Sequence, residues 1–234
     1  MSRVEKLDPL IAAQLQAALP SAVIGRQIVV LEQTGSTNDS ILQVASSQGA
    51  AVSSLPAVAS AKEGPPSLVN EGLVLFAEHQ TAGRGQRGNR WESAVGKGLW
   101  FSILLRPQIQ INESWRLTVW AIEAISEVIR AEFALDSTIK MPNDVQLHGR
   151  KVAGVLVEMR AQQKAPHLAV VGIGVNANQS VFPNELQDRA TSLAMTLGRP
   201  VNRHEVAVAL LRHLDRTYRE RFVTEGFLTC QARH

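Results

Sequence analysis

The segment from Gln80 to Trp91 combines three glycines with three arginines that recur at every third position. The glycines at 83, 85 and 88 match the GxGxxG pattern of dinucleotide-binding turns, but no apolar helix pattern follows at 89–98, so we reject that interpretation. Unhindered backbone amides and guanidinium groups both favour an oxyanion such as a carboxylate or phosphate. The segment therefore predicts an anion-binding loop, mobile when empty and ordered when liganded. A solvated basic loop is the alternative.

Lys151 stands immediately before the apolar run Val152–Val157. A lysine at the mouth of a buried strand is costly unless an anion meets it, which predicts a second anion contact. Gly154, within the same run, would leave space beside Lys151 for a ligand to approach closely. The alternative is a lysine whose stem covers apolar surface at an exposed hairpin end. Asp144 could hold Mg²⁺ or orient an amine, although most turn aspartates only cap backbone amides.

The segment Gly172–Asn176 follows a strand pattern but has neither a third glycine nor a capped helix after it. It therefore also fails as a dinucleotide-binding fingerprint, and it predicts a place where a ligand lies against bare backbone. The single cysteine, Cys230, has no partner for an intrachain disulfide. Neither Cys230 nor the six histidines have a spacing that indicates nucleophilic catalysis or metal binding, so we assign them no chemistry.

These side chains must be positioned by strands and helices that the apolar pattern locates. Expected strands cover 23–31, 73–77, 99–105, 138–141, 145–147, 152–157 and 168–175. Expected helices cover about 10–19, a short segment after the turn at 35–38, 117–129 with Asn112 as its cap, and 203–222. Strands that follow strands exclude the regular alternation of a doubly wound fold. The sequence predicts an α+β fold: a mixed β-sheet packed against helices on one side, in a single domain spanning 1–234.

Composition narrows the class of protein further. The chain has 234 residues, of which 45% are apolar, enough to bury a core without disulfides. No apolar run reaches the roughly 18 residues of a spanning helix, and polar residues interrupt the N-terminal stretch, so we expect a soluble cytoplasmic protein without a membrane partner. The net charge of +3 is weak evidence for a nucleic-acid partner. Residues 46–70 are poor in large apolar side chains and predict a mobile surface insertion.

Several motifs follow one another in a specific order along the chain. They are Ser36-Thr37-Asn38, Gln80 through Trp91, Lys140-Met141-Pro142-Asn143-Asp144, Arg150 through Glu158, and Gly172 through Asn176. This order closely resembles the catalytic domain of biotin protein ligases, over about Ser36 to Phe227. The resemblance implies the mixed sheet of that family, which is related to the class II tRNA synthetase core. It also implies an ATP-dependent, AMP-forming reaction, in which biotin and ATP give biotinyl-5'-AMP and a lysine of a carboxylase's biotin carboxyl carrier protein then takes the biotinyl group.

The resemblance assigns roles by motif position. Biotin-binding residues would be Ser36, Thr37, Asn38, Gln80, Arg84, Gly85, Gln86, Lys151, Gly154 and Gly174. Adenylate-binding residues would be Arg87, Trp91, Lys140, Asn143 and Asn176. Lys151, Arg84 and Asp144 would be catalytic, with Asp144 also holding Mg²⁺ or positioning the incoming amine. Because biotin's carboxylate is already ionised at pH 7, the first step needs charge neutralisation and alignment instead of a base.

The sequence departs from the family pattern at identifiable points. Met141 replaces a tryptophan that many relatives have, so a flexible thioether takes the place of a ring. Gln86 replaces an arginine of some members, which predicts looser retention of the adenylate. Because the sequence stops at His234, we do not expect the small β-barrel domain that usually follows the final helix. The stretch before Val23 is too short for the DNA-binding domain of repressor relatives, so we expect no binding to DNA.

Three alternative functions stay open at this point. Lipoate ligases resemble the same core, although the loop at Gly83–Gly88 favours biotin. A relative that binds biotin but has lost transfer activity is a second alternative. The third is a nucleic-acid-binding module that uses Trp91 and the arginines of its loop. The sequence leaves open which carrier protein would be modified and whether the chain is a monomer or a homodimer.

Overall fold

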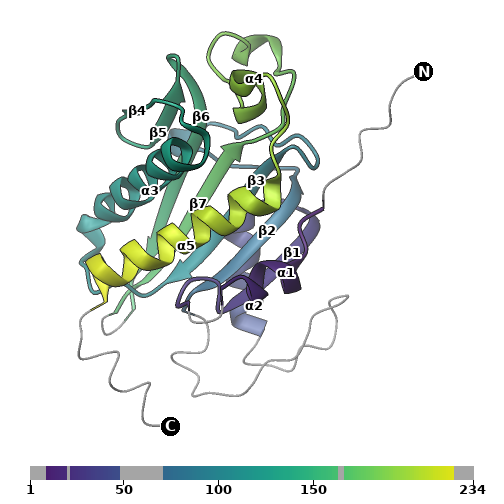
Figure 1. Ribbon diagram of the computed structural model, residues 1–234. Helices are drawn as coiled ribbons and strands as arrows, with labels where there is room; N and C mark the ends of the chain where they lie inside the picture. The colour runs from purple at the N-terminus through teal and green to yellow at the C-terminus, as the bar shows by residue number, and fades with distance from the viewer. Residues whose placement is uncertain (1–8, 20–21, 48–70, 163–165, 224–234) are drawn as a thin grey trace.

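The computed structural model describes residues 9–19, 22–47, 71–162 and 166–223. Seven strands form one sheet in the order β1-β2-β3-β7-β6-β5-β4 (Figure 1). They are β1 (Gln27–Thr34), β2 (Leu73–Gln80), β3 (Gly98–Leu105), β4 (Ser137–Lys140), β5 (Asp144–Leu147), β6 (Arg150–Arg160) and β7 (Leu168–Asn176). Strands β1 and β2 pair in parallel, and every other neighbouring pair is antiparallel. The predicted mixed sheet is confirmed.

Helices cover both faces of this sheet. On one face lie α1 (Ala12–Ala17), α3 (Trp115–Phe133) and α5 (Arg203–Phe222), and Figure 1 shows α3 and α5 crossing in front of the strands. On the opposite face lies α2 (Thr37–Ser47), whose Ile41 packs against Val29 and Leu75. The expectation of helices on one side only is therefore wrong for α2. Successive strand residues point to opposite faces, so the apolar runs of β1 and β2 supply a second, smaller core under α2.

The helix boundaries follow their capping residues. Asn202 accepts hydrogen bonds from the backbone N–H groups of His204 and Glu205, at 2.9 and 3.2 Å, and α5 begins at Arg203 as predicted. Asn112 is not the cap of α3, because it lies inside a short 3₁₀ segment, Ile111–Glu113, and Ser114 immediately precedes the helix. Two further 3₁₀ segments, Gln86–Gly88 and Asn184–Leu186, and the short helix α4 (Leu193–Leu197) were not predicted.

The first strand begins later than the apolar pattern suggested. The backbone N–H groups of Val23 and Ile24 donate to Oδ1 of Asp215 on α5, at 2.7 and 2.9 Å, and Gly25 has a φ of +91°. The backbone turns at Ile24 and Gly25, and regular pairing starts at Gln27. Most of the predicted insertion at 46–70 lies outside the described residues, and residues 46–47 are the end of α2. No helix of the described ranges is long and apolar enough to cross a membrane.

Candidate functional site

A small pocket lies on the α2 side of the sheet, where the start of α2 meets β6, β7 and residues 81–91, which we call the glycine loop. Its volume is about 40 Å³, close to the space one water molecule occupies. Eleven of the predicted site residues line it: Ser36, Thr37, Asn38, Gln80, Arg84, Gly85, Trp91, Asn143, Lys151, Gly154 and Gly174. The two predicted cations, Arg84 and Lys151, thus belong to one site.

The start of α2 supplies three buried polar residues to this pocket, Ser36, Thr37 and Asn38. The first N–H groups of a helix have no partner within the helix, and here the side chain of Gln80 supplies one. Its Oε1 accepts from the backbone N–H of Thr37 at 2.8 Å and from the Thr37 hydroxyl at 3.2 Å. The predicted turn that leads into a short helix is confirmed, and Gln80 fixes the helix start against β2.

Asn38 is held in one orientation by two neighbours. The Ser102 hydroxyl on β3 donates to Asn38 Oδ1 at 2.6 Å, and Asn38 Nδ2 donates to Glu158 Oε2 on β6 at 2.7 Å. The Ser102 hydroxyl also lies 2.8 Å from the Thr37 hydroxyl. Gly172 on β7 lies directly below, because a Cβ there would overlap the Asn38 side chain. The buried polar groups at the helix start are therefore fixed by hydrogen bonds that continue into the sheet.

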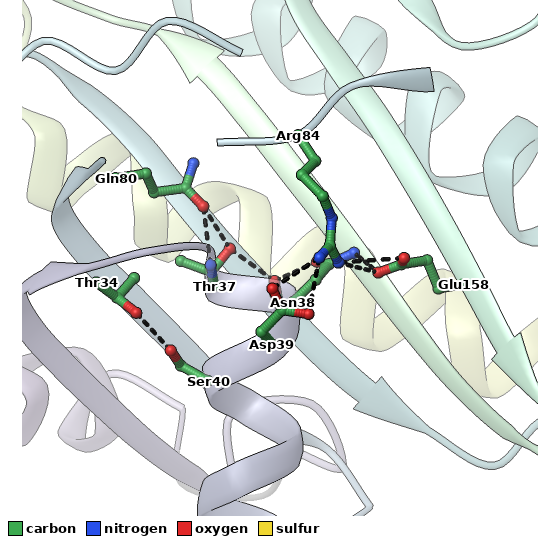
Figure 2. Close-up of polar contacts among 9 residues, drawn as sticks. Thr34, Thr37, Asn38, Asp39, Ser40, Gln80, Arg84 and Glu158 are labelled. Atoms are coloured by element: carbon green, nitrogen blue, oxygen red, sulfur yellow. Dashed lines mark hydrogen bonds and ion pairs between the residues drawn. The ribbon is translucent and has the colours of Figure 1, made fainter. Parts of the chain in front are cut away.

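Arg84 is paired with two carboxylates (Figure 2). One terminal nitrogen donates to both oxygens of Asp39, at 2.8 and 2.7 Å, and the other donates to both oxygens of Glu158, at 3.1 and 2.9 Å. The hydrogen bond to Asp39, partly opposed by burial and reinforced by the charges of Glu158 and Asp39, raises the pKa of the Arg84 guanidinium. Because these carboxylates compensate Arg84, the repulsion expected within an empty basic loop is reduced.

The glycine loop folds back on itself and places Trp91 over the sheet. The Gly85 N–H donates to Asn89 O at 2.7 Å, and the Trp91 N–H donates to Gly83 O at 2.9 Å. A Cβ on Gly154 would lie 2.9 Å from the Trp91 ring, and one on Gly174 would lie 2.5 Å from it. Gly154 and Gly174 are register partners on β6 and β7. The bare backbone predicted for a ligand is thus covered by the indole of Trp91.

Lys151 reaches the same floor from the start of β6. Its Nζ lies 2.6 Å from Asp144 Oδ1 and 5.0 Å from the centroid of the Trp91 ring. Its backbone is held on both sides, because the Lys151 N–H donates to Arg189 O at 2.8 Å and Lys151 O accepts from the Thr191 N–H at 2.9 Å. The side chain is 29% exposed, so the Lys151 side chain is partly buried.

Five predicted residues lie outside the pocket lining: Gln86, Arg87, Lys140, Asp144 and Asn176. Arg87 and Lys140 are exposed, and the carboxylate of Asp144 pairs with Lys151, while its backbone is the register partner of Gly154. Asn176 is 4% exposed and is hydrogen-bonded internally, since its Nδ2 donates to Thr191 O at 3.0 Å and its Oδ1 accepts from Gln179 at 2.9 Å. In this conformation Asn176 therefore supports the segment that holds Lys151.

Sequence reasoning gave no role to three residues that organise the site: Asp39, Ser102 and Glu158. Ser102 had a detectable signal, because it is a polar residue inside an otherwise apolar strand, where an unpaired polar group is costly. Glu158 interrupts the apolar stretch of β6, but its side chain is 40% exposed, so its signal is weaker. Asp39 lies in the first turn of α2, a position that acidic residues favour for local reasons, so its sequence gave no distinct signal.

A larger groove of about 620 Å³ lies on the other face of the sheet, between α3 and α5. Its lining contains none of the predicted site residues. Volume alone therefore does not identify the site. The smaller pocket is the candidate site because eleven of the predicted residues line it.

Comparison with known proteins gives consistent matches. The model of the biotin/lipoate A/B protein ligase family matches residues 54–176. The bifunctional ligase/repressor BirA of Bacillus spizizenii is 30% identical over 226 residues, which cover 96% of this chain and 63% of that relative. The biotin--[acetyl-CoA-carboxylase] ligase of Mycobacterium tuberculosis is 33% identical over 212 residues, covering 88% of this chain and 70% of that protein. The chain thus spans less than two thirds of the length of the Bacillus relative.

A solved structure has the same fold. The biotin protein ligase of Aquifex aeolicus in complex with biotin and ATP superposes with a TM-score of 0.62 at 29% sequence identity. The match covers 85% of this chain and 74% of that one. The α+β fold class expected from the motif order is therefore confirmed.

Proposed function

The chain belongs to the biotin/lipoate A/B protein ligase family, and from that premise we propose that it is a biotin protein ligase. It would join biotin to ATP to form biotinyl-5'-AMP, and then transfer the biotinyl group to a lysine of a biotin carboxyl carrier protein. The observation that carries this proposal is that Lys151, the glycine loop and the polar start of α2 line one and the same pocket. Relatives named as biotin ligases support biotin as the carboxylate.

The first step needs no proton transfer. An oxygen of biotin's ionised carboxylate attacks the α-phosphorus of ATP, the bond to pyrophosphate breaks, and a mixed anhydride forms. Two anionic groups must approach each other, so a fixed positive charge beside them lowers the barrier. Lys151 is placed for this role, because its backbone is pinned to Arg189 and Thr191 and its ammonium group points over the pocket floor. Ser36, Thr37, Asn38 and Gln80 would hold the ring system of biotin.

The second step needs a neutral amine. The carrier lysine must lose its proton before its nitrogen attacks the acyl carbon, after which the bond to the phosphate oxygen breaks and AMP leaves. Asp144 lies beside Lys151, and it is the carboxylate we assign to orienting that amine. Trp91 and Asn143 line the same pocket and would contact the adenylate.

Magnesium would be held mainly by the nucleotide. Asp144 offers one carboxylate, and within the described residues no group of three or more histidine, cysteine or acidic side chains could hold a metal ion. Mg²⁺ commonly binds through one or two carboxylates together with substrate phosphates and water, so this donor set fits such a site. The ion would supply positive charge to the phosphates of ATP.

The present pocket must enlarge before it can hold biotin. A volume of about 40 Å³ has no room for a bicyclic ring system, and the indole of Trp91 covers the floor formed by Gly154 and Gly174. Movement of the Trp91 ring away from Gly154 and Gly174 would uncover this backbone. Binding of biotin therefore requires the Trp91 side chain to move, while the backbone of the glycine loop stays in place as a wall of the pocket.

The deciding experiment measures exchange of labelled pyrophosphate into ATP with Mg²⁺ and either biotin or lipoate. Exchange that requires biotin supports the proposal, whereas exchange that requires lipoate would assign the chain to the lipoate branch of its family. Transfer to a biotin carboxyl carrier domain then tests the second step. Exchange without transfer would identify a relative that activates biotin but does not attach it.

A further inference from the structure

We propose that Asp39 and Glu158 anchor the glycine loop over the pocket through the side chain of Arg84. Arg84 is then a positioning residue that acts through these carboxylates, instead of a direct contact for the negative charge of biotin or of the phosphate. This inference rests on the proposed function in one respect, which is that biotin is taken as the ligand of the pocket. The anchor itself is a property of the protein without ligand.

The geometry of Arg84 leaves its terminal nitrogens little capacity for a further anion. Each of them already donates to both oxygens of a carboxylate, one to Asp39 and the other to Glu158 (Figure 2). One positive charge is thus matched by two negative charges at 2.7 and 2.9 Å. An approaching carboxylate or phosphate meets a cluster with a net negative charge, which does not attract it.

The two carboxylates link the loop to separate parts of the fold. Asp39 belongs to the first turn of α2, and Glu158 lies on β6 on the same face as Gly154. Glu158 Oε2 accepts from Arg84 and from Asn38 Nδ2, and Asn38 is in turn bonded to Ser102 on β3. A continuous path of hydrogen bonds therefore runs from the glycine loop to the buried centre of the sheet.

The planar guanidinium fork is what makes this link possible. Contacts to two carboxylates in different directions use the two terminal nitrogens, which are held at a fixed angle that a lysine ammonium does not offer. The anchored segment includes Trp91, whose indole covers the pocket floor, and Gly85, which lines the wall. By fixing Arg84, the carboxylates set where the backbone of both residues lies.

The first test uses the protein without any ligand. Hydrogen exchange is followed by mass spectrometry on a peptide that covers the glycine loop, in the wild type and in the Asp39→Asn, Glu158→Gln double variant. We expect at least about fivefold faster exchange at the loop amides, because the anchor holds them in their hydrogen bonds to Asn89 O and Gly83 O. Unchanged exchange in the loop would overturn the proposal.

Glu123→Gln is the matched control. Glu123 pairs with Arg221 at 2.6 Å, with side chains that are 37% and 44% exposed, and this pair joins α3 to α5 on the opposite face of the sheet. The Arg84 pairs have similar exposures, between 39% and 49%. The control removes a comparable ion pair, and exchange in the glycine loop should stay at the wild-type rate.

The second test separates anchoring from direct contact by comparing biotin with its neutral carboxamide. If Arg84 acts as an anchor, Arg84→Ala weakens the binding of both compounds by the same factor, about 5- to 20-fold for two lost ion pairs. Arg84→Lys keeps a positive charge but not the fork, so it should resemble Arg84→Ala. Loss of biotin affinity alone, or retention of it by Arg84→Lys, would assign Arg84 to direct contact and overturn the proposal.

The acidic partners give the complementary result. In the Asp39→Asn, Glu158→Gln background, Arg84→Ala should cause little further loss of affinity, because its effect passes through these residues. Tighter binding of biotin by the double variant would mean that the carboxylates compete with the ligand for Arg84, contrary to the proposal. If the wild type binds neither biotin nor its carboxamide, the proposed function is wrong, and hydrogen exchange alone then decides whether the anchor exists.

Discussion

The ammonium group of Lys151 lies 2.6 Å from Oδ1 of Asp144, and the two side chains are only 29% and 23% exposed. The Lys151 end of this ion pair reaches over the floor of the pocket, while Asp144 stays outside the lining. The pair therefore consists of a cation that lines the pocket and a carboxylate that lies behind it, outside the lining. Different steps of the proposed reaction should depend on the two residues.

Replacement of Lys151 should greatly lower the rate of the first step, the formation of biotinyl-5'-AMP. We expect Lys151→Ala to lower biotin-dependent exchange of pyrophosphate into ATP at least ~100-fold, as does loss of one preorganised group that stabilises charge in a transition state. Arg150→Ala removes the exposed neighbouring cation and should change the rate by less than about twofold. Exchange by Lys151→Ala above a tenth of the wild-type rate would rule out the proposed role of Lys151.

Replacement of Asp144 should affect the second step more than the first. In Asp144→Asn the carboxylate that we assign to the incoming amine is lost, while the charge of Lys151 is kept. The fold-loss in the rate of biotin transfer to a carrier domain should therefore be at least about ten times the fold-loss in the rate of pyrophosphate exchange. Single-turnover transfer from preformed biotinyl-5'-AMP, compared with exchange, gives this ratio. Equal losses in both assays would place Asp144 in adenylate formation instead.

A methyl group at Gly172 should disturb the buried polar network. The added Cβ would overlap the side chain of Asn38, which Ser102 and Glu158 hold in place. We expect Gly172→Ala to lower the free energy of unfolding by about 1–3 kcal/mol, measured by urea denaturation. Gly35→Ala is the matched control, because a Cβ there meets nothing within 4 Å, and it should be neutral or slightly stabilising.

Binding of biotin should change the fluorescence of Trp91. In the ligand-free protein the indole rests on Gly154 and Gly174, edge-on to Trp100, with the ring centroids 5.8 Å apart. Because the pocket must enlarge, biotin should displace the ring and shift its emission. The shift should be lost in Trp91→Phe, with binding followed separately by calorimetry. An equal shift in the variant would mean that another tryptophan reports the binding and that Trp91 stays in place.

Acidification should destabilise the protein through His213 on α5. Burial of the ring lowers the pKa of His213 despite the nearby charge of Glu127, and Arg216 lowers it further. Since Arg216 donates to Nδ1 at 3.3 Å, the ring is neutral and donates from Nε2 to Glu127 at 2.9 Å. Between the lowered pKa of the folded state and the ordinary value of 6.5, the unfolded chain binds more protons, so stability rises with pH.

The corresponding variant is His213→Gln, which does not titrate. From about pH 7.5 to about pH 5 the wild type should lose more unfolding free energy than His213→Gln does. Urea denaturation at both pH values measures the difference, and the other ionisable groups, Glu220 on α5 included, are the same in both proteins. A smaller loss in the wild type would mean that Glu127 raises the pKa of His213 above its ordinary value.

Much of the fold was predictable because its signals are local. All eight residues of β3 are buried, and its nearly continuous apolar run located it to within one residue. The bounds of α5 were predicted correctly, since Asn202 caps it and one face is apolar. The face covered by α2 was not predictable, because a short helix with a few apolar residues fits either side of a sheet whose strands are apolar on both.

The sequence by itself determined which chemical groups the site would use and the order in which they occur. Gly154 does lie beside Lys151, as predicted, but the alternation of a regular strand does not explain this, because the two residues are three positions apart. In a regular strand they would point to opposite sides, but the pairing of β5 with β6 shifts register between Val145 and Gln146, so Val152 becomes an extra residue.

The partners of Arg84 were decided in the same way. Asp39 and Glu158 lie 45 and 74 positions away in the sequence, and only the packing of α2 and β6 brings their carboxylates to one guanidinium. The motif of the glycine loop specifies that an arginine stands at position 84. The carboxylates that pair with this arginine come from distant segments, and they lie beside it only once the sheet and its helices have assembled.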